Sequence, residues 1–275
     1  MENQTIHLLD SAMELPKKIK NDFFELSLFS TKSRYHEKNE DSLGCVWFDN
    51  GDCILAVADG VGSCARAAEA SQIGVTEVTN HVAKSGVSGC YRSAILEAFD
   101  VANERILKEV KGSSTTLVVT EIHHGWIRSF HAGDSLAMVV GGRGKQKYMT
   151  VGHSPFEIAR EVGLSTHDQD ESELRNTITN CLGDQEMRIE VGPRFTTSPQ
   201  DMIIMGSDGL FDNVDVVEEA QQLTGSSPDS LMHHLLKKGL HQMYEFEGDA
   251  YCKADDLTML AFKRQNLAQG LCKNA

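Results

Sequence analysis

The sequence predicts an α+β fold, a four-layer α-β-β-α sandwich in which two mostly antiparallel sheets are flanked by helix pairs. Three observations support this prediction. Short, bounded apolar runs typical of buried strands occur in separate parts of the chain. Between them lie segments whose apolar residues recur at helical spacing. Turn residues separate consecutive strands, and such short connections join antiparallel neighbours.

In the N-terminal half, strands are expected to precede a pair of helices. Residues 1–20 are polar and are interpreted as a lead-in to the fold. The expected elements are a strand at 24–29, strands at 43–48 and 53–58, and helices at 65–84 and 88–110. The turn Asp49-Asn50-Gly51-Asp52 predicts that the second and third strands form a hairpin. The two helices are expected to be antiparallel and joined around Ser85-Gly86.

In the C-terminal half, the pattern returns to strands and then repeats the helix pair. The expected elements are strands at 115–122, 125–131 and 135–140, a short helix at 155–162, a strand at 202–205, helices at 214–223 and 230–244, and a last strand at 257–263. Residues 152–190 are less regular and are interpreted as an excursion from the core. We therefore expect one domain over residues 1–275, with its core at about 24–263.

The composition argues against a nucleic-acid-binding, membrane-spanning or secreted protein. The chain has 40 acidic and 26 basic residues and a net charge of −14, which argues against nucleic acid or an anionic membrane as the main partner. No apolar stretch approaches the ~18 residues of a membrane span, and the first residues lack the order of a secretory signal. The seven cysteines are scattered without Cys-x-x-Cys spacing. We expect reduced thiols in a cytoplasmic protein.

Short acidic segments lie against the ends of apolar runs. They are Asn39-Glu40-Asp41, Ala58-Asp59-Gly60, Gly133-Asp134-Ser135, Ser207-Asp208-Gly209 and Asp255-Asp256. Carboxylates at strand ends can converge although they are far apart in sequence, but several cannot share a small site unless cations neutralise them. Oxygen ligands favour magnesium or manganese over zinc or copper. The pattern predicts a divalent-metal site with more than one ion.

With these segments the chain resembles the metal-dependent serine/threonine protein phosphatases, the type 2C or PPM family. The matching segments occur in the family's order: Asn39-Glu40-Asp41-Ser42, Val57-Ala58-Asp59-Gly60-Val61-Gly62, Gly112-Ser113-Ser114-Thr115-Thr116, Ala132-Gly133-Asp134-Ser135, Gly206-Ser207-Asp208-Gly209-Leu210-Phe211-Asp212 and Asp255-Asp256-Leu257-Thr258. They span nearly the whole chain. The Asp-Gly-Val-Gly form and the compact loops are most similar to the bacterial branch.

The resemblance implies a phosphatase domain with two manganese or magnesium ions at one end of the sandwich and a flap at about 152–190. It implies that Asp59 bridges both ions, that the Gly60 carbonyl binds one of them, and that Asp208 and Asp255 complete the site. Two ions bridged by a carboxylate lower the pKa of a shared water, which becomes a hydroxide nucleophile. They also neutralise negative charge on the phosphoryl group. The expected activity is hydrolysis of phosphoserine and phosphothreonine in proteins.

The resemblance also implies smaller roles for three other acidic residues. Glu40 and Asp41 are expected to bind an ion directly or to hold its waters, so that Asp41 joins Asp59, Asp208 and Asp255 as the catalytic set. Asp134 matches the position that, with Asp208, holds a third and weaker ion in many members. The alternative for Asp134 is a hairpin turn without a metal.

The chain departs from the family at two positions. His36 stands where the family usually has an arginine that grips phosphate, and Arg34 lies two residues earlier. Arginine binds phosphate bidentately, whereas histidine is only partly charged at neutral pH. Either residue is a candidate for contact with the substrate phosphate. Val61 replaces a histidine proposed as general acid in animal members, so water is expected to protonate the leaving group.

Two alternatives to a protein phosphatase stay open at this point. One is a catalytically inactive fold-mate that acts as a scaffold, which would predict eroded metal ligands. The other is a phosphatase of a small phosphorylated metabolite. If the substrate is a phosphoprotein, a serine/threonine kinase is the expected partner enzyme.

Overall fold

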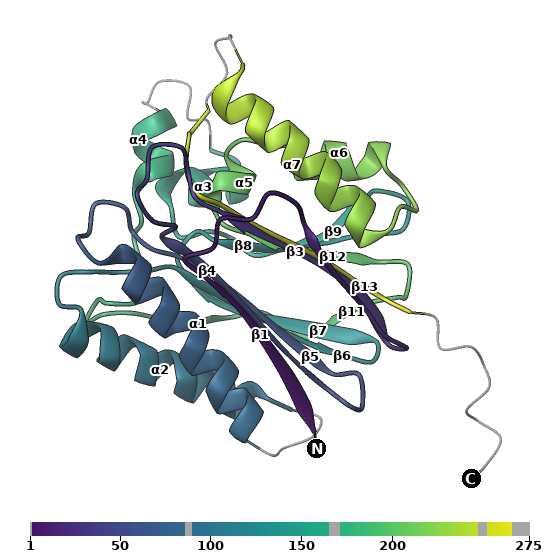
Figure 1. The fold of residues 1–275 in the computed structure, drawn as a ribbon, viewed down its shortest axis with the longest axis horizontal. Helices are drawn as coiled ribbons and strands as arrows, with labels where there is room; N and C mark the ends of the chain where they lie inside the picture. Colours follow the sequence, from purple (N-terminus) through teal and green to yellow (C-terminus); the bar gives the residue numbers. More distant parts are fainter. Residues whose placement is uncertain (1, 86–89, 165–170, 247–251, 266–275) are drawn as a thin grey trace.

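Two sheets face each other between helices, which confirms the predicted four-layer class (Figure 1). The computed structural model describes residues 2–85, 90–164, 171–246 and 252–265. The seven-stranded sheet consists of β1 (Asn3–Leu9), β4 (Asp41–Phe48), β5 (Cys53–Asp59), β6 (Leu117–His123), β7 (Trp126–Ala132), β10 (Glu190–Val191) and β11 (Phe195–Thr196). The six-stranded sheet consists of β2 (Lys17–Lys20), β3 (Phe24–Thr31), β13 (Leu257–Arg264), β12 (Met202–Gly206), β8 (Leu136–Val140) and β9 (Gln146–Met149).

Both faces of the central strands are covered, which explains their continuous apolar runs. In β5, Cys53, Leu55 and Val57 pack between the sheets, whereas Ile54 and Ala56 pack under helices. This alternation is the period of two expected of a strand. β4 and β5 pair antiparallel on either side of the turn at residues 49–52, which confirms the predicted hairpin.

Helices cover the outer face of each sheet, as Figure 1 shows. α1 (Ala67–Lys84) and α2 (Arg92–Glu109) pack on the larger sheet, and their predicted junction lies partly outside the described residues. The other sheet is covered by α5 (Asp208–Phe211), α6 (Val216–Gln222) and α7 (Pro228–Tyr244). α7 begins where the Ser227 hydroxyl accepts a hydrogen bond from the Ser230 amide, with Pro228 in the first turn.

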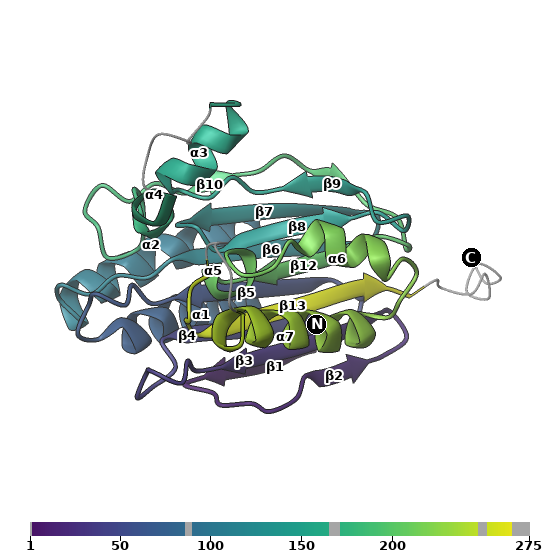
Figure 2. The same ribbon diagram turned by 90° about the horizontal axis from the view of Figure 1, so that it is seen from above.

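The less regular segment from residue 152 to 190 contains α3 (Pro155–Glu161) and α4 (Glu171–Asn176). Figure 2 shows both helices outside the two sheets at one end of the sandwich. Residues 165–170 of this segment lie outside the described residues. Within the described parts of the chain, no helix is both long and apolar enough to cross a bilayer.

The interpretation of residues 1–20 as a lead-in is wrong. β1 pairs along its whole length with β4, and β2 pairs with β3, so that the segment provides an edge strand to each sheet. An edge strand has one unpaired side and tolerates polar and charged residues, which hide the alternation of a buried strand. The short strands β9, β10 and β11 are edge elements that the sequence pattern did not predict either.

Candidate metal centre

Acidic residues from both sheets meet at one end of the sandwich. Asp41 begins β4 and Asp59 ends β5, and the two residues are partners across the antiparallel pair. Asp208 follows β12, and Asp255 precedes β13, its antiparallel neighbour. In an antiparallel pair the end of one strand lies beside the start of the next. This connectivity brings four distant acidic segments together, and Ser207 Oγ joins the sheets by donating to Asp41 Oδ2 at 2.7 Å.

Two carboxylate oxygens in this cluster are buried without a partner. Asp41 is 1% exposed, and its Oδ1 has no hydrogen bond within the described residues. The same holds for Oδ1 of Asp208. Unpartnered buried oxygens are costly and rare in folded proteins. Since both are hard oxygen donors, they fit a divalent cation such as Mn²⁺ or Mg²⁺.

The electrostatics of the cluster also favour bound cations. Burial raises the pKa of Asp41 and of Asp59 well above the usual range of aspartate. Repulsion adds to the effect, from Asp256 on Asp41 and from Asp41 on Asp59. Burial and the charge of Asp208 likewise raise the pKa of Asp255. Divalent cations would hold these groups ionised by supplying the missing positive charge.

Glycines at two positions allow the backbone to approach closely. A Cβ on Gly60 would lie 2.5 Å from the carbonyl oxygen of Ala67, the first residue of α1. A Cβ on Gly209 would lie 1.9 Å from the carbonyl oxygen of Asp256. Both distances are shorter than any real contact of a side chain. The glycines that follow Asp59 and Asp208 are therefore required for packing beside the cluster.

Asp256 organises the loop that carries Glu40. Its Oδ1 accepts a hydrogen bond from the Ser33 amide at 2.6 Å, and its Oδ2 accepts one from the Glu40 amide at 2.5 Å. Burial raises the pKa of the Glu40 carboxyl, which places that side chain in the same acidic environment. Asp256 belongs to the last of the matching motifs, but its role of fixing the loop before Asp41 is visible only in the structure.

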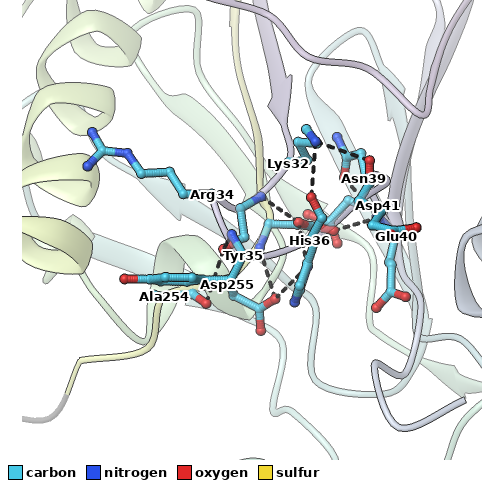
Figure 3. Close-up of polar contacts among 12 residues, drawn as sticks. Lys32, Arg34, Tyr35, His36, Asn39, Glu40, Asp41, Ala254 and Asp255 are labelled. Atoms are coloured by element: carbon cyan, nitrogen blue, oxygen red, sulfur yellow. Dashed lines mark hydrogen bonds and ion pairs between the residues drawn. The ribbon is translucent and has the colours of Figure 1, made fainter.

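The two candidates for phosphate contact lie apart. The His36 ring places Nδ1 2.8 Å from Asp256 Oδ1 and 4.0 Å from Asp255 Oδ1. The Arg34 guanidinium stacks 4.2 Å from the ring centre of Tyr244 in α7. Figure 3 shows the Arg34 side chain extending away from His36 and Asp255. His36 thus borders the acidic cluster, whereas the guanidinium of Arg34 is directed elsewhere.

Asp134 lies in the turn between β7 and β8, next to Asp208. Burial and the charge of Asp208 raise the pKa of Asp134 to about 8. A pocket between α5 and the excursion is lined by both carboxylates and by Phe156, Arg175 and Asp212. Arg175 of α4 donates to Asp212 at 2.9 Å and so connects the excursion to this edge of the cluster.

Lys253 is a member of the site that sequence reasoning missed. Its Nζ lies 2.5 Å from Asp208 Oδ2 and 2.7 Å from Asp255 Oδ2. Burial alone would raise the pKa of Asp208, but Lys253 lowers it to below the usual range. The available signal was a lysine two residues before Asp255 in an acidic segment.

The chain is similar to phosphatases in sequence and in fold. A family model described as protein phosphatase 2C matches residues 31–243. The S. agalactiae serine/threonine phosphatase is 22% identical with a TM-score of 0.74, over 88% of this chain and 100% of that chain. For Stp1 from Staphylococcus aureus, the identity is 19% and the TM-score 0.72, over 94% of this chain and 100% of that chain.

A further similar structure is the catalytic domain of the serine/threonine protein phosphatase PstP in complex with two manganese ions. It is 20% identical with a TM-score of 0.68, over 89% of this chain and 99% of that chain. No curated protein sequence matches significantly. At these identities the solved structures establish a shared fold, and the match to the family model covers most of the chain.

Proposed function

We propose, because the chain belongs to the protein phosphatase 2C family of metal-dependent serine/threonine protein phosphatases, that Asp59, Asp208 and Asp255 hold its catalytic divalent ions. Asp59 would be a ligand shared by two ions, and the Gly60 carbonyl would be a ligand of one of them. The observation that carries this assignment is the buried, unpartnered Oδ1 of Asp208 within a cluster of acids whose pKa values are mostly raised. We extend the phosphatase domain to residues 1–275.

The ions are Mn²⁺ or Mg²⁺. A count of two is supported by the manganese complex of the PstP catalytic domain. A third ion is assigned to Asp134 and Asp208 at the edge of the cluster, where water would supply most of its ligands. When bound, the ions supply a nucleophile from water and neutralise charge on the phosphoryl group.

The residues of the chain orient the reactants. Glu40 and Asp41 are assigned to bind an ion directly or to hold its waters, and the Ser207 hydroxyl holds one oxygen of Asp41. Asp256 fixes the backbone of Glu40, so that the first acidic segment keeps its position relative to Asp255. Arg34 and His36 are the side chains proposed to contact the substrate phosphate.

The proposed substrate is a cytoplasmic protein phosphorylated on serine or threonine by a partner kinase. A small phosphorylated metabolite is the alternative substrate, and comparing turnover of phosphopeptides with that of phosphometabolites distinguishes the two. The scaffold alternative is disfavoured because Asp41, Asp59, Asp208 and Asp255 are all present. The cytoplasmic assignment is supported by the free state of the described cysteines.

The proposed function is tested by removing the metal. The purified protein is expected to hydrolyse para-nitrophenyl phosphate and a phosphothreonine peptide with Mn²⁺ or Mg²⁺ and to lose both activities in excess chelator. Adding back manganese should restore them. Full activity in chelator would contradict the metal assignment, and no activity at any metal concentration would favour the scaffold.

Exchanging the candidates for phosphate contact should change KM. His36 borders the acidic cluster, whereas Arg34 would have to leave its stack on Tyr244 to reach a phosphate there. If Arg34 makes that contact, Arg34→Ala is expected to raise KM for a phosphopeptide roughly tenfold, about 1.4 kcal/mol. His36→Arg is expected to lower KM, because a permanent bidentate donor replaces a partly protonated ring. Arg143→Ala, in an exposed turn, is the control for the loss of a positive charge.

Because Arg34→Ala also removes the stack on Tyr244, thermal melting should accompany its kinetics. If neither variant changes KM, the ions alone hold the phosphate and both residues lose their proposed role.

A further inference from the structure

Lys253 places a positive charge among the carboxylates assigned to metal binding. Its amine contacts Oδ2 of both Asp208 and Asp255, at 2.5 and 2.7 Å. These are oxygens of two residues that would also have to face a divalent ion. The Lys253 side chain is 30% exposed, whereas the partner side chains are 14% and 18% exposed. The two ion pairs are thus partly shielded from water. Charge interactions are stronger in such an environment than in bulk water.

The backbone of Lys253 is held by one side chain. Asn213 Oδ1 accepts a hydrogen bond from the Lys253 amide at 3.0 Å, and Asn213 Nδ2 donates to the Lys253 carbonyl at 2.8 Å. The same Nδ2 donates to the Gly209 carbonyl at 3.0 Å. Asn213 therefore fixes Lys253 to the segment that also carries Asp208, so that the position of the amine is built into the fold.

The influence of this charge reaches beyond its two contacts. Burial raises the pKa of Asp59 and of Asp134, and the positive charge of Lys253 offsets part of that rise. The Lys253 amine contacts a carboxylate on each of two residues, and opposite charges at this distance favour its protonated form. A permanent monovalent cation thus partly neutralises the acids on which a divalent ion depends.

We propose that Lys253 is an internal counter-cation of the metal centre, which holds Asp208 and Asp255 together before an ion binds and competes with that ion for their oxygens. The inference rests on the proposed assignment of Asp208 and Asp255 as ligands. Its consequence is a metal centre that folds without metal and releases an ion more readily than its acidic residues alone would. Lys253 is then a positioning residue that sets the metal affinity.

A role in binding substrate phosphate is the main rival. The geometry favours the counter-cation, because two carboxylates already contact the amine within the described structure. A phosphate group would have to displace at least one of them. The rival predicts a change in KM for substrate and no change in metal affinity, so the two roles are separable.

The test compares wild type with Lys253→Met, which keeps much of the side chain's length and removes its charge. Lys237→Met, on the exposed face of α7, is the matched control. Calorimetric titration with Mn²⁺ should show at least ~10-fold tighter binding by Lys253→Met, about 1.4 kcal/mol. In chelator the same variant should melt about 2–4 °C below wild type, because the buried acids lose their counter-cation. Saturating Mn²⁺ should reduce or reverse this difference, since the tighter-bound ion stabilises the fold.

Each outcome decides the proposal. Tighter binding with a lower metal-free melting temperature supports it. Unchanged or weaker manganese binding overturns it, and a raised KM alone assigns Lys253 to phosphate. If Lys253→Met does not fold in chelator, Lys253→Gln and refolding in Mn²⁺ provide the same comparison. Failure of the proposed function is distinct, because wild type itself would then bind no Mn²⁺ in the titration.

Discussion

Asp59→Asn and Asp208→Asn are each expected to lower turnover of para-nitrophenyl phosphate by at least about 100-fold in saturating Mn²⁺. Each variant keeps the shape of the side chain and removes one negative charge. Asp208 offers a buried oxygen without a partner, and Asp59 is close enough to Asp41 and Asp208 for their charges to raise its pKa. The loss follows because an amide is a poorer ligand for a hard cation. Initial rates over a range of Mn²⁺ concentrations measure it.

The fold is expected to survive the exchange of Asp59. Asp59 has a raised pKa in the folded protein, so the metal-free fold loses stability as pH rises from the unfolded pKa toward the folded one. A neutral amide at this position would remove that loss, and metal-free Asp59→Asn should be at least as stable as wild type at neutral pH. Asp100→Asn, at an exposed position of α2, is the control for net charge. Near-normal turnover by Asp59→Asn, with manganese bound, would exclude Asp59 from the catalytic set.

Asp134→Ala should separate two kinds of substrate. Turnover of a phosphothreonine peptide is expected to fall by about 100-fold, and that of para-nitrophenyl phosphate by only a few-fold. An alkyl alkoxide is a poor leaving group and needs a proton, which we expect a water on the proposed third ion to supply. Nitrophenolate leaves with little help. Measuring kcat for both substrates with wild type and Asp134→Ala tests the role.

The control for Asp134→Ala is the binding of the two core ions, those assigned to Asp59, Asp208 and Asp255. Asp134 lies at the edge of the cluster, in the pocket that it shares with Asp208 and Arg175. Calorimetry should therefore show the core ions still bound, and thermal melting should show an intact fold. Equal losses of kcat on both substrates would refute a role in protonating the leaving group. Loss of the core ions would make Asp134 part of the main site instead.

The sequence alone was sufficient to predict the strands that are buried on both faces. β5 is buried on both faces, so its continuous apolar run predicted a strand wherever its neighbours lie. The acidic residues at strand ends were predictable for a similar reason, because adjacent antiparallel strands must bring their ends together. Asp41 and Asp59 are partners in the structure as that rule requires.

Edge strands were not predictable in the same way. β1 and β2 are mostly exposed, and the backbone hydrogen bonds to β4 and β3 define them as strands. Such backbone bonds depend on which segment lies alongside. They do not require a particular pattern of side chains in an exposed edge strand. A local pattern therefore missed them.

The tertiary structure alone decided where the charged side chains of the site point. Arg34 and His36 are close in sequence, yet Tyr244 in α7 holds the guanidinium while Asp256 holds the imidazole. Lys253 reaches Asp208 because Asn213, 40 residues earlier, fixes its backbone. Long side chains have many rotamers of similar energy, and the partner that selects one is supplied by the fold. The sequence thus determined which acidic residues are the proposed ligands, and the tertiary structure determined which cationic side chains lie among them.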